Sequence, residues 1–203
     1  MGIQYSTQKN LLPQMVQQAK KLNHKSVEVG VFDGDHAWLA GIHEYGCNIT
    51  AKSGGYLTIP CNPQAASASA RSFPDLFVLT LEDGSKWLVK EQGKDRLKFM
   101  YQLVKSVTIP ERSFLRAGFD ACHEKVVGQI EKALGQYLIN GTQIDTILKQ
   151  CGMELASQIK KYARDLRSPP KARITVSSYG GGKDNPLLKT GEMIQSITYR
   201  IEE

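Results

Sequence analysis

The residue pairs best suited to chemistry are His43-Glu44 and His123-Glu124, because a histidine followed by a glutamate opens the HExxH motif of zinc proteases. In that motif a second histidine, four residues after the first, completes the pair of zinc ligands on one helix face. Here Cys47 stands at that position in the first pair and Val127 in the second. One His and one Cys do not make a zinc site, so both pairs are expected to be structural.

Two aspartates, Asp33 and Asp35, flank Gly34 and are candidate ligands for a cation. Glu44 is the twelfth residue counted from Asp33, which is the position of the terminal glutamate in an EF-hand loop. Apolar and glycine residues, however, occupy the ligand positions between them. A turn followed by the N-cap of a helix is therefore the simpler interpretation.

The stretch Gly180–Lys183 ("GGGK") is the nearest approach to a phosphate-binding loop. A P-loop requires a glycine five residues before its final Gly-Lys, where this chain has Ser177. It also requires Ser or Thr after the lysine, where Asp184 would repel a phosphate. These departures favour a flexible loop without a phosphate site.

Basic residues gather at the end of the second predicted long helix and in the segment that follows it. Cations at the C-terminus of a helix oppose its macrodipole, which explains part of the cluster. A surface that faces DNA or an acidic partner is the alternative, and stacking on single-stranded bases is not expected because only Tyr162 is interleaved. The six residues predicted to face DNA are Lys160, Lys161, Arg164, Arg167, Lys171 and Arg173.

The composition sets limits on the class of protein. The chain has 203 residues and a formal charge of +6, from 26 basic and 20 acidic residues. This bias favours nucleic acid or acidic protein surfaces as partners. No apolar run approaches the roughly 20 residues that span a bilayer, so no membrane partner is expected. The four cysteines, Cys47, Cys61, Cys122 and Cys151, have no CxxC or metal spacing, and no metal or cofactor is expected. Cys122 and Cys151 fall on apolar helix faces and are predicted to be buried free thiols, which indicates a reducing cytoplasm.

Apolar periodicity predicts the elements of the first half of the chain. Residues 61–75 are small and polar and predict a long loop, and residues 51–98 as a whole read as an insertion. The pair Asp83-Gly84 predicts the turn of a β-hairpin. The predicted elements are a helix over 7–22, a strand over 26–32, a helix over 36–45 ended by Gly46, a strand over 57–60, and hairpin strands over 76–81 and 86–90.

The second half predicts two long helices, which Pro169-Pro170 brings to an end. The predicted elements are an extended segment over 99–109, helices over 113–140 and 144–166, a mobile stretch over 177–185, a short helix over 186–195 and a strand over 196–201. Together they predict an α+β fold in one domain, 1–203. We expect a small, mainly antiparallel β-sheet packed against two long helices, with an inserted β-hairpin and long loops.

The stretch Ile109–Arg116 ("IPERSFLR") joins the predicted extended segment to the first long helix. Pro110 lacks an N–H and so suits the end of a strand. Arg112 and Arg116 are predicted to project from one helix face, one turn apart. Because cations are unfavourable at a helix N-terminus, we expect them to pair with carboxylates of a neighbouring element or subunit. The predicted subunit interface consists of Arg112, Arg116 and, from the hairpin, Phe77 and Trp87.

Four sequence blocks occur in a characteristic order: "VGVFDG" (29–34), "AGIHEYG" (40–46), "IPERSFLR" (109–116) and "PLLKTGEMIQSITYRI" (186–201). In this order they resemble the tailed-bacteriophage virion-morphogenesis proteins, and within these the tail-completion or head–tail joining group. The stretch 57–105 is similar to a long-form subgroup. The segment 169–186 departs from the pattern that relatives often carry.

The resemblance implies a non-enzymatic neck or tail-completion subunit of the virion. It implies a ring of six copies between the tail end and the head connector, assembled in the host cytoplasm and located at the head–tail junction. The implied partners are other copies of the chain, tail terminator or tail tube proteins, and the portal, adaptor or stopper proteins of the connector. Packaged DNA would pass through the ring and meet only non-specific phosphate contacts.

Two other functions remain open at the level of the sequence. The basic charge also suits a free nucleic-acid-binding protein. A metal-dependent hydrolase would use His43, Glu44 and Asp33 as its reactive or ligating groups.

Overall fold

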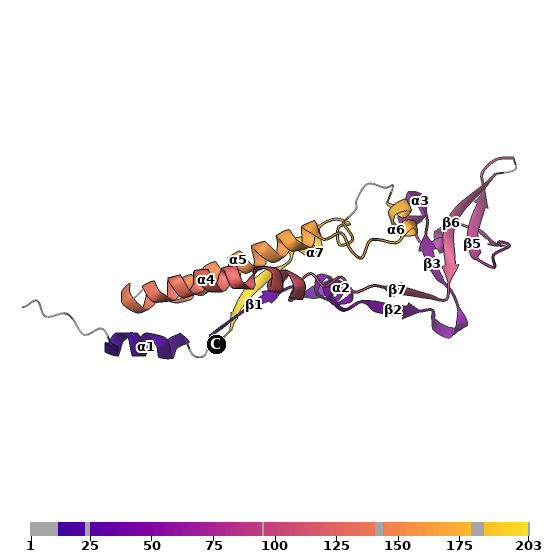
Figure 1. The fold of residues 1–203 in the computed structure, drawn as a ribbon. Helices are drawn as coiled ribbons and strands as arrows, with labels where there is room; N and C mark the ends of the chain where they lie inside the picture. Colours follow the sequence, from indigo (N-terminus) through magenta and orange to yellow (C-terminus); the bar gives the residue numbers. More distant parts are fainter. Residues whose placement is uncertain (1–11, 23–24, 95, 141–143, 180–184, 203) are drawn as a thin grey trace, which may run out of the picture. The chain divides into compact units, whose positions relative to one another are not determined.

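The computed structural model describes residues 12–22, 25–94, 96–140, 144–179 and 185–202. The chain has an α+β fold, as predicted, with helices and antiparallel strands (Figure 1). It divides into two compact units, each assembled from separate segments. Unit 1 comprises Met1–Ala37, Leu115–Ala163 and Glu192–Glu203, and unit 2 comprises Trp38–Phe114 and Arg164–Gly191. The prediction of one domain over 1–203 stays a prediction.

Unit 1 is built on two long helices and a two-stranded sheet. The bounds are α1 (Leu12–Leu22), β1 (Ser26–Gly30), α4 (Arg116–Asn140), α5 (Ile144–Asp165), α7 (Glu192–Gln195) and β8 (Thr198–Glu202), and α5 ends just inside unit 2. Strands β1 and β8 pair antiparallel. Tyr137 of α4 packs with Ile147 and Cys151 of α5. Gly152 lies directly under the ring of Tyr199, where a Cβ would have no room, and so α5 approaches β8 closely.

Unit 2 contains most of the strands. Its bounds are α2 (Gly34–Tyr45, whose first turn belongs to unit 1), β2 (Cys47–Thr50), η1 (Lys52–Gly54), β3 (Leu57–Pro60), α3 (Pro63–Ala66), η2 (Ala70–Ser72), β4 (Phe77–Thr80), β5 (Lys86–Glu91), β6 (Leu97–Val104), β7 (Ser106–Ile109) and α6 (Arg173–Ser178). Strands β2 and β7 form a two-stranded sheet, and a four-stranded antiparallel sheet has the order β3-β6-β5-β4.

The four-stranded sheet includes the predicted hairpin, formed by β4 and β5. Gly84 adopts a positive φ of 79° in its turn, and the Asp83 carboxylate accepts a hydrogen bond from the Ser85 N–H at 2.8 Å. Met100 and Tyr101 are buried with Ala65 of α3 in the core of this sheet. Because Met100 lies at a β-bulge, both side chains of this pair reach the same core.

Several sequence predictions require correction. The expected small sheet is three separate sheets, and the extended segment 99–109 is divided between β6 and β7, which belong to different sheets. Residues 61–75 are not a plain loop, since they contain α3 and η2, and the helix predicted over 186–195 is confined to α7. The first long helix begins at Arg116 rather than Ser113. Strand β2 and helix α6 were not predicted.

Some predictions fall outside the described residues, among them the start of the first helix (7–11) and Gly180–Lys183. Within the described part, the long helices α4 and α5 and the strands β1, β3 and β8 confirm the predicted elements, although their ends differ by a few residues. Every helix found there is too short or too polar for a transmembrane span.

Candidate functional site

The second and third sequence blocks contact each other in unit 2 through residues 40–46 and 109–114. Strand β2, which follows the first of these segments, pairs antiparallel with β7, so that Cys47 lies opposite Ile109. The backbone N–H of Arg112 donates to the carbonyl oxygen of His43 at 2.7 Å. We call this contact, between residues 43–46 and residues 109–114, the motif clamp.

Glu44 is the buried centre of the motif clamp, with only 2% of its surface exposed. Its Oε1 accepts a hydrogen bond from the Ser113 hydroxyl at 2.7 Å, and its Oε2 accepts one from the Phe114 N–H at 2.8 Å. A buried carboxylate without donors is costly, and these two charge-assisted bonds replace the lost water. Glu44 therefore holds the segment that leads into α4, which favours a structural role over that of a reactive base.

Arg112 is also buried, with 6% of its surface exposed. Its Nε donates to the carbonyl oxygen of Pro169 at 2.8 Å, and one terminal nitrogen donates to that of Pro170 at 2.9 Å. The guanidinium thus ties the chain that leaves α5 to the motif clamp. Two backbone carbonyls take the place of the carboxylate that the sequence predicted as its partner.

The predicted arrangement of Arg112 and Arg116 is therefore wrong. Arg112 precedes α4, which begins at Arg116, so the two residues are not one turn apart on a helix. Arg116 is exposed, whereas Arg112 is enclosed in unit 2 and its interface role loses its basis. Arg116 keeps the predicted interface role as a hypothesis.

The His43 imidazole lies beside the Arg112 guanidinium, with 3.5 Å between Nδ1 and a terminal nitrogen of Arg112. Burial, together with the nearby charges of Arg112 and Lys171, lowers the pKa of His43 from 6.5 to about 4. His43 is therefore neutral near pH 7. Because a guanidinium only donates, Nδ1 is assigned as the acceptor of this contact and Nε2 as the protonated nitrogen.

Gly46 ends α2 with a positive φ of 72°, as expected for the residue after a helix. A Cβ at this position would lie 2.9 Å from both the Glu111 nitrogen and the Ile109 oxygen. Glycine is thus required at position 46 for two reasons. Its φ is positive, and the backbone of the third block lies too close for a Cβ. This contact explains why the sequence carries "HEYG" and "IPERSF" together.

The other candidate ligands do not form a metal centre among the described residues, where no group of three or more His, Cys, Asp or Glu side chains is placed to hold an ion. In unit 1, Asp33 is exposed, and its carboxylate lies 4.0 Å from Arg200. His123 stacks on Phe119 in α4. All four cysteines are free; Cys151 is buried as predicted, whereas Cys122 is only partly buried.

The predicted interface residues Phe77 and Trp87 share one face of the four-stranded sheet. Phe77 lies opposite Val89, and Leu79 lies opposite Trp87, so these side chains point to the same side. The ring of Trp87 packs edge-on against Phe99 with 5.3 Å between centroids. We call Phe77, Leu79, Trp87, Leu97 and Phe99 the aromatic sheet face; its outer residues, Phe77, Leu97 and Phe99, are 37–44% exposed.

The six residues predicted to face DNA are divided between the units. Lys160 and Lys161 belong to unit 1, and Arg164, Arg167, Lys171 and Arg173 belong to unit 2. Two of them have local roles. Arg167 donates to the carbonyl oxygens of Arg164 and Leu166 at the end of α5, and the Lys171 Nζ donates to that of Leu188 at 2.6 Å. Contact with DNA stays a prediction.

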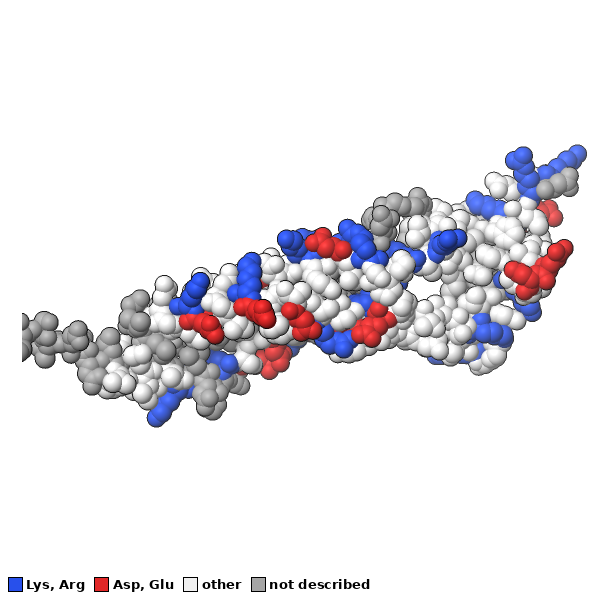
Figure 2. All heavy atoms as spheres, viewed as in Figure 1, with Lys and Arg blue, Asp and Glu red and all other residues white. Residues whose placement is uncertain are grey.

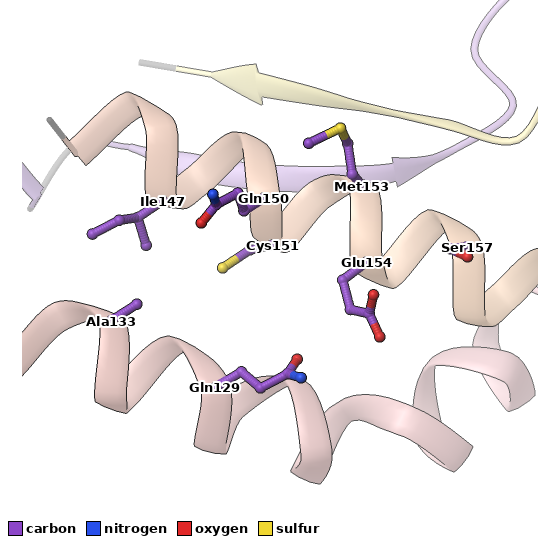
Figure 3. Close-up of a pocket in the computed structure, with 8 residues that line it drawn as sticks. All are labelled: Gln129, Ala133, Ile147, Gln150, Cys151, Met153, Glu154 and Ser157. Carbon is purple, nitrogen blue, oxygen red and sulfur yellow. The ribbon is translucent and has the colours of Figure 1, made fainter.

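An open pocket of about 520 Å³ lies between α4 and α5 in unit 1 (Figure 3). Gln129 and Ala133 face it from α4, and Ile147, Cys151 and Glu154 face it from α5. Burial raises the pKa of the Cys151 thiol, which keeps it protonated near neutral pH. The lining therefore combines the Glu154 carboxylate and polar amide groups with apolar side chains and a protonated thiol.

Two exposed aromatic residues of α2 were missed at the level of the sequence. Trp38 and Tyr45 are both 69% exposed and stand seven residues apart, so they lie on the same side of the helix in unit 2. Aromatic residues are enriched at protein interfaces, which makes both candidate contact residues. Their spacing in "HAWLAGIHEY" was the available signal.

Comparison with protein-family models, curated proteins and solved structures found no match to this chain.

Proposed function

We propose that the chain is a structural subunit of a tailed-bacteriophage virion, a tail-completion or neck protein that forms a ring of six copies. The ring joins the tail to the head connector and surrounds the channel through which DNA passes. In this proposal the protein is not an enzyme and uses no cofactor. Its partners are its own copies, tail terminator or tail tube proteins, and the portal, adaptor or stopper proteins of the connector.

The motif clamp is the observation that supports this proposal most. The resemblance depends on short blocks that are far apart in the sequence, and short blocks can coincide by chance. Here two of them contact each other, and Glu44 from one block binds Ser113 and Phe114 from the other. Since a buried Glu44 without these donors would destabilise the fold, the two blocks have a physical reason to occur together. The resemblance to the phage proteins then includes two blocks that pack against each other in this chain.

A closed ring requires two different complementary surfaces on each subunit. The aromatic sheet face and the exposed Arg116 are the predicted contact surfaces, and Trp38 and Tyr45 of α2 add a further candidate. Exposed aromatic side chains of this kind mark protein contact sites. The predicted DNA-facing residues suit a channel, because attraction to phosphates without base contacts lets any sequence pass.

Phage particles that lack the protein test this proposal. In a phage that encodes the chain, a nonsense mutation in its gene should give full heads and separate, unattached tails in negative-stain images. Supplying the protein from a plasmid should restore joined particles. Normal virions in the absence of the protein would contradict the proposal.

The alternative function is free nucleic-acid binding, and the exposure of Arg164, Arg167 and Arg173 in unit 2 favours it. The isolated protein would then bind duplex DNA with an affinity that falls steeply with salt, by a slope of about −0.9 for each phosphate contact. Replacing the three arginines with glutamine should reduce that slope. Absence of salt-dependent binding by the isolated protein would remove this alternative.

A further inference from the structure

Strand β4 is an open edge of the four-stranded sheet in unit 2. In the order β3-β6-β5-β4, it pairs with β5 on one side, and no other described strand pairs with it. The opposite edge differs, because β3 carries Pro60, which has no N–H, and contacts α6. Of these two edges, β4 is therefore the one suited to accept another strand.

The sequence of this edge does not protect it. Residues 76–81 read "LFVLTL", without charge or proline, although natural edge strands commonly carry one of these to prevent pairing. Val78 is 58% exposed. With four residues, β4 forms few backbone bonds, so the groups at its two ends decide which strand it accepts and in which direction.

The two ends of the sheet differ in net charge, although each carries residues of both signs. Thr80 lies opposite Lys86, so β4 ends at the turn region 81–86, which contains Glu82 and Asp83 against the single base Lys86. Phe77 lies opposite Val89, so β4 starts near the turn that joins β5 to β6. Residues 90–98 around that turn contain Lys90, Lys94, Arg96 and Lys98 against Glu91 and Asp95, and Asp75 stands two residues before β4, which leaves a smaller excess of positive charge. Figure 2 shows basic side chains at the tip of the β5–β6 hairpin, with acidic side chains both close to this tip and further from it.

We propose that β4 pairs with β4 of a second copy of this chain, antiparallel about a two-fold axis, to give a sheet of eight strands. Antiparallel pairing brings the acidic end of each copy beside the basic end of the other, and does so twice. Parallel pairing would bring like charges together. One open edge per copy also favours a closed two-fold contact over a chain of copies. The pair is a property of the free protein and does not rest on the proposed function.

Charge reversal at the two ends tests the pairing in the full-length protein. Sedimentation velocity should show a concentration-dependent dimer, and either Glu82→Lys with Asp83→Lys or Lys94→Glu with Arg96→Glu should weaken it about tenfold or more. An equimolar mixture of the two variants should form a mixed dimer, because one copy then has two basic ends and the other two acidic ends. Reversal of exposed charges on α4, Glu131→Lys with Lys132→Glu, is the matched control and should have no effect.

Hydrogen exchange locates the contact independently of these variants. The amides of Phe77–Thr80 should gain protection as the protein concentration rises, while those of α5 should not change. Far-UV circular dichroism of each variant verifies that it is folded. A protein that stays monomeric at millimolar concentration, a dimer without protection of β4, or reversal variants that fail to pair when mixed would each overturn the proposal.

Discussion

Glu44 and Arg112 are charged residues of the motif clamp that are buried in the structure. Glu44 lies in a helix and Arg112 lies just before one. Both are charged residue types that usually occupy exposed positions. The carbonyl oxygens that bind Arg112 belong to Pro169 and Pro170, more than fifty residues further along the chain. No local pattern encodes a partner at that separation, so the sequence predicted an outward arginine and a carboxylate partner. Only the fold supplies the carbonyls.

Replacing Glu44 with glutamine should destabilise the protein by about 1–3 kcal/mol. Glutamine keeps one acceptor but places an NH₂ group where the Phe114 N–H or the Ser113 hydroxyl needs an oxygen. The free energy of unfolding in urea measures the loss. Glu124→Gln on the exposed surface of α4 is the matched control and should leave the free energy within about 0.5 kcal/mol of the original. Equal effects of the two substitutions would refute the buried role of Glu44.

The neutral His43 predicts a specific dependence of stability on pH. Its pKa is about 4 in the folded protein against 6.5 for the ordinary side chain, so the unfolded chain binds the proton more readily. The stability that this difference provides is present above pH 6.5 and is lost as the pH falls toward 4. For a half-buried group open to solvent screening, we expect a loss of about 1–2 kcal/mol.

The comparison with His43→Gln isolates this effect from the titration of carboxylates. Urea unfolding at intervals from pH 4 to pH 7 should give a steeper fall in stability for the original protein than for the variant. Parallel curves would mean that the folded protein does not depress the pKa of His43.

At the scale of elements, the junction between α2 and β2 depends on Gly46. Alanine there must adopt a positive φ, at a cost of about 1–2 kcal/mol, and its Cβ must also displace the Ile109–Glu111 backbone. Gly34 at the start of α2 has a similar φ of 67° but open space around it. Gly46→Ala should therefore lower the melting temperature clearly more than Gly34→Ala. Equal losses would show that the third block does not pack on Gly46.

Local signals predicted the elements whose cause is local. The Asp83-Gly84 pair specified the β4–β5 hairpin, and the long apolar stripes specified α4 and α5. Helix α3 also had a signal, which the prediction overlooked: Asn62 accepts a hydrogen bond from the Ala65 N–H, and Pro63 follows it in the first turn.

The division into sheets had no comparable signal. Strands β6 and β7 follow each other with a break only at Lys105, and their partners lie in different parts of the chain. Strand β2 is four residues long and mostly exposed, too short to show a period. Helix α6 reads "RITVSS", whose β-branched residues favour a strand. It is nevertheless helical in the structure, where it contacts α3 and β3. Non-local packing decided each of these.

At the scale of the whole molecule, the exposed surfaces and the buried motifs have separate roles in the proposed function. The motif clamp lies inside unit 2, whereas the outer residues of the aromatic sheet face, Phe77, Leu97 and Phe99, are exposed. A subunit of an assembly needs this separation, because contact residues must be free to meet a partner after folding. Variants of the sheet face should therefore affect assembly more than stability.

The double substitution Phe77→Ser with Trp87→Ser tests this separation in a phage that depends on the chain. The variant loses the ring contact of Trp87 with Phe99, worth about 1 kcal/mol beyond the area it buries, and the hydrogen bond from Trp87 Nε1 to the Ser85 hydroxyl. Circular dichroism should show that it remains folded. The yield of joined particles should fall about tenfold or more, because these side chains are proposed to lie at the centre of a subunit contact. Val127→Ser with Met153→Ser, two exposed apolar residues of unit 1, is the matched control. A folded Phe77/Trp87 variant that joins heads and tails normally would exclude the aromatic sheet face from assembly.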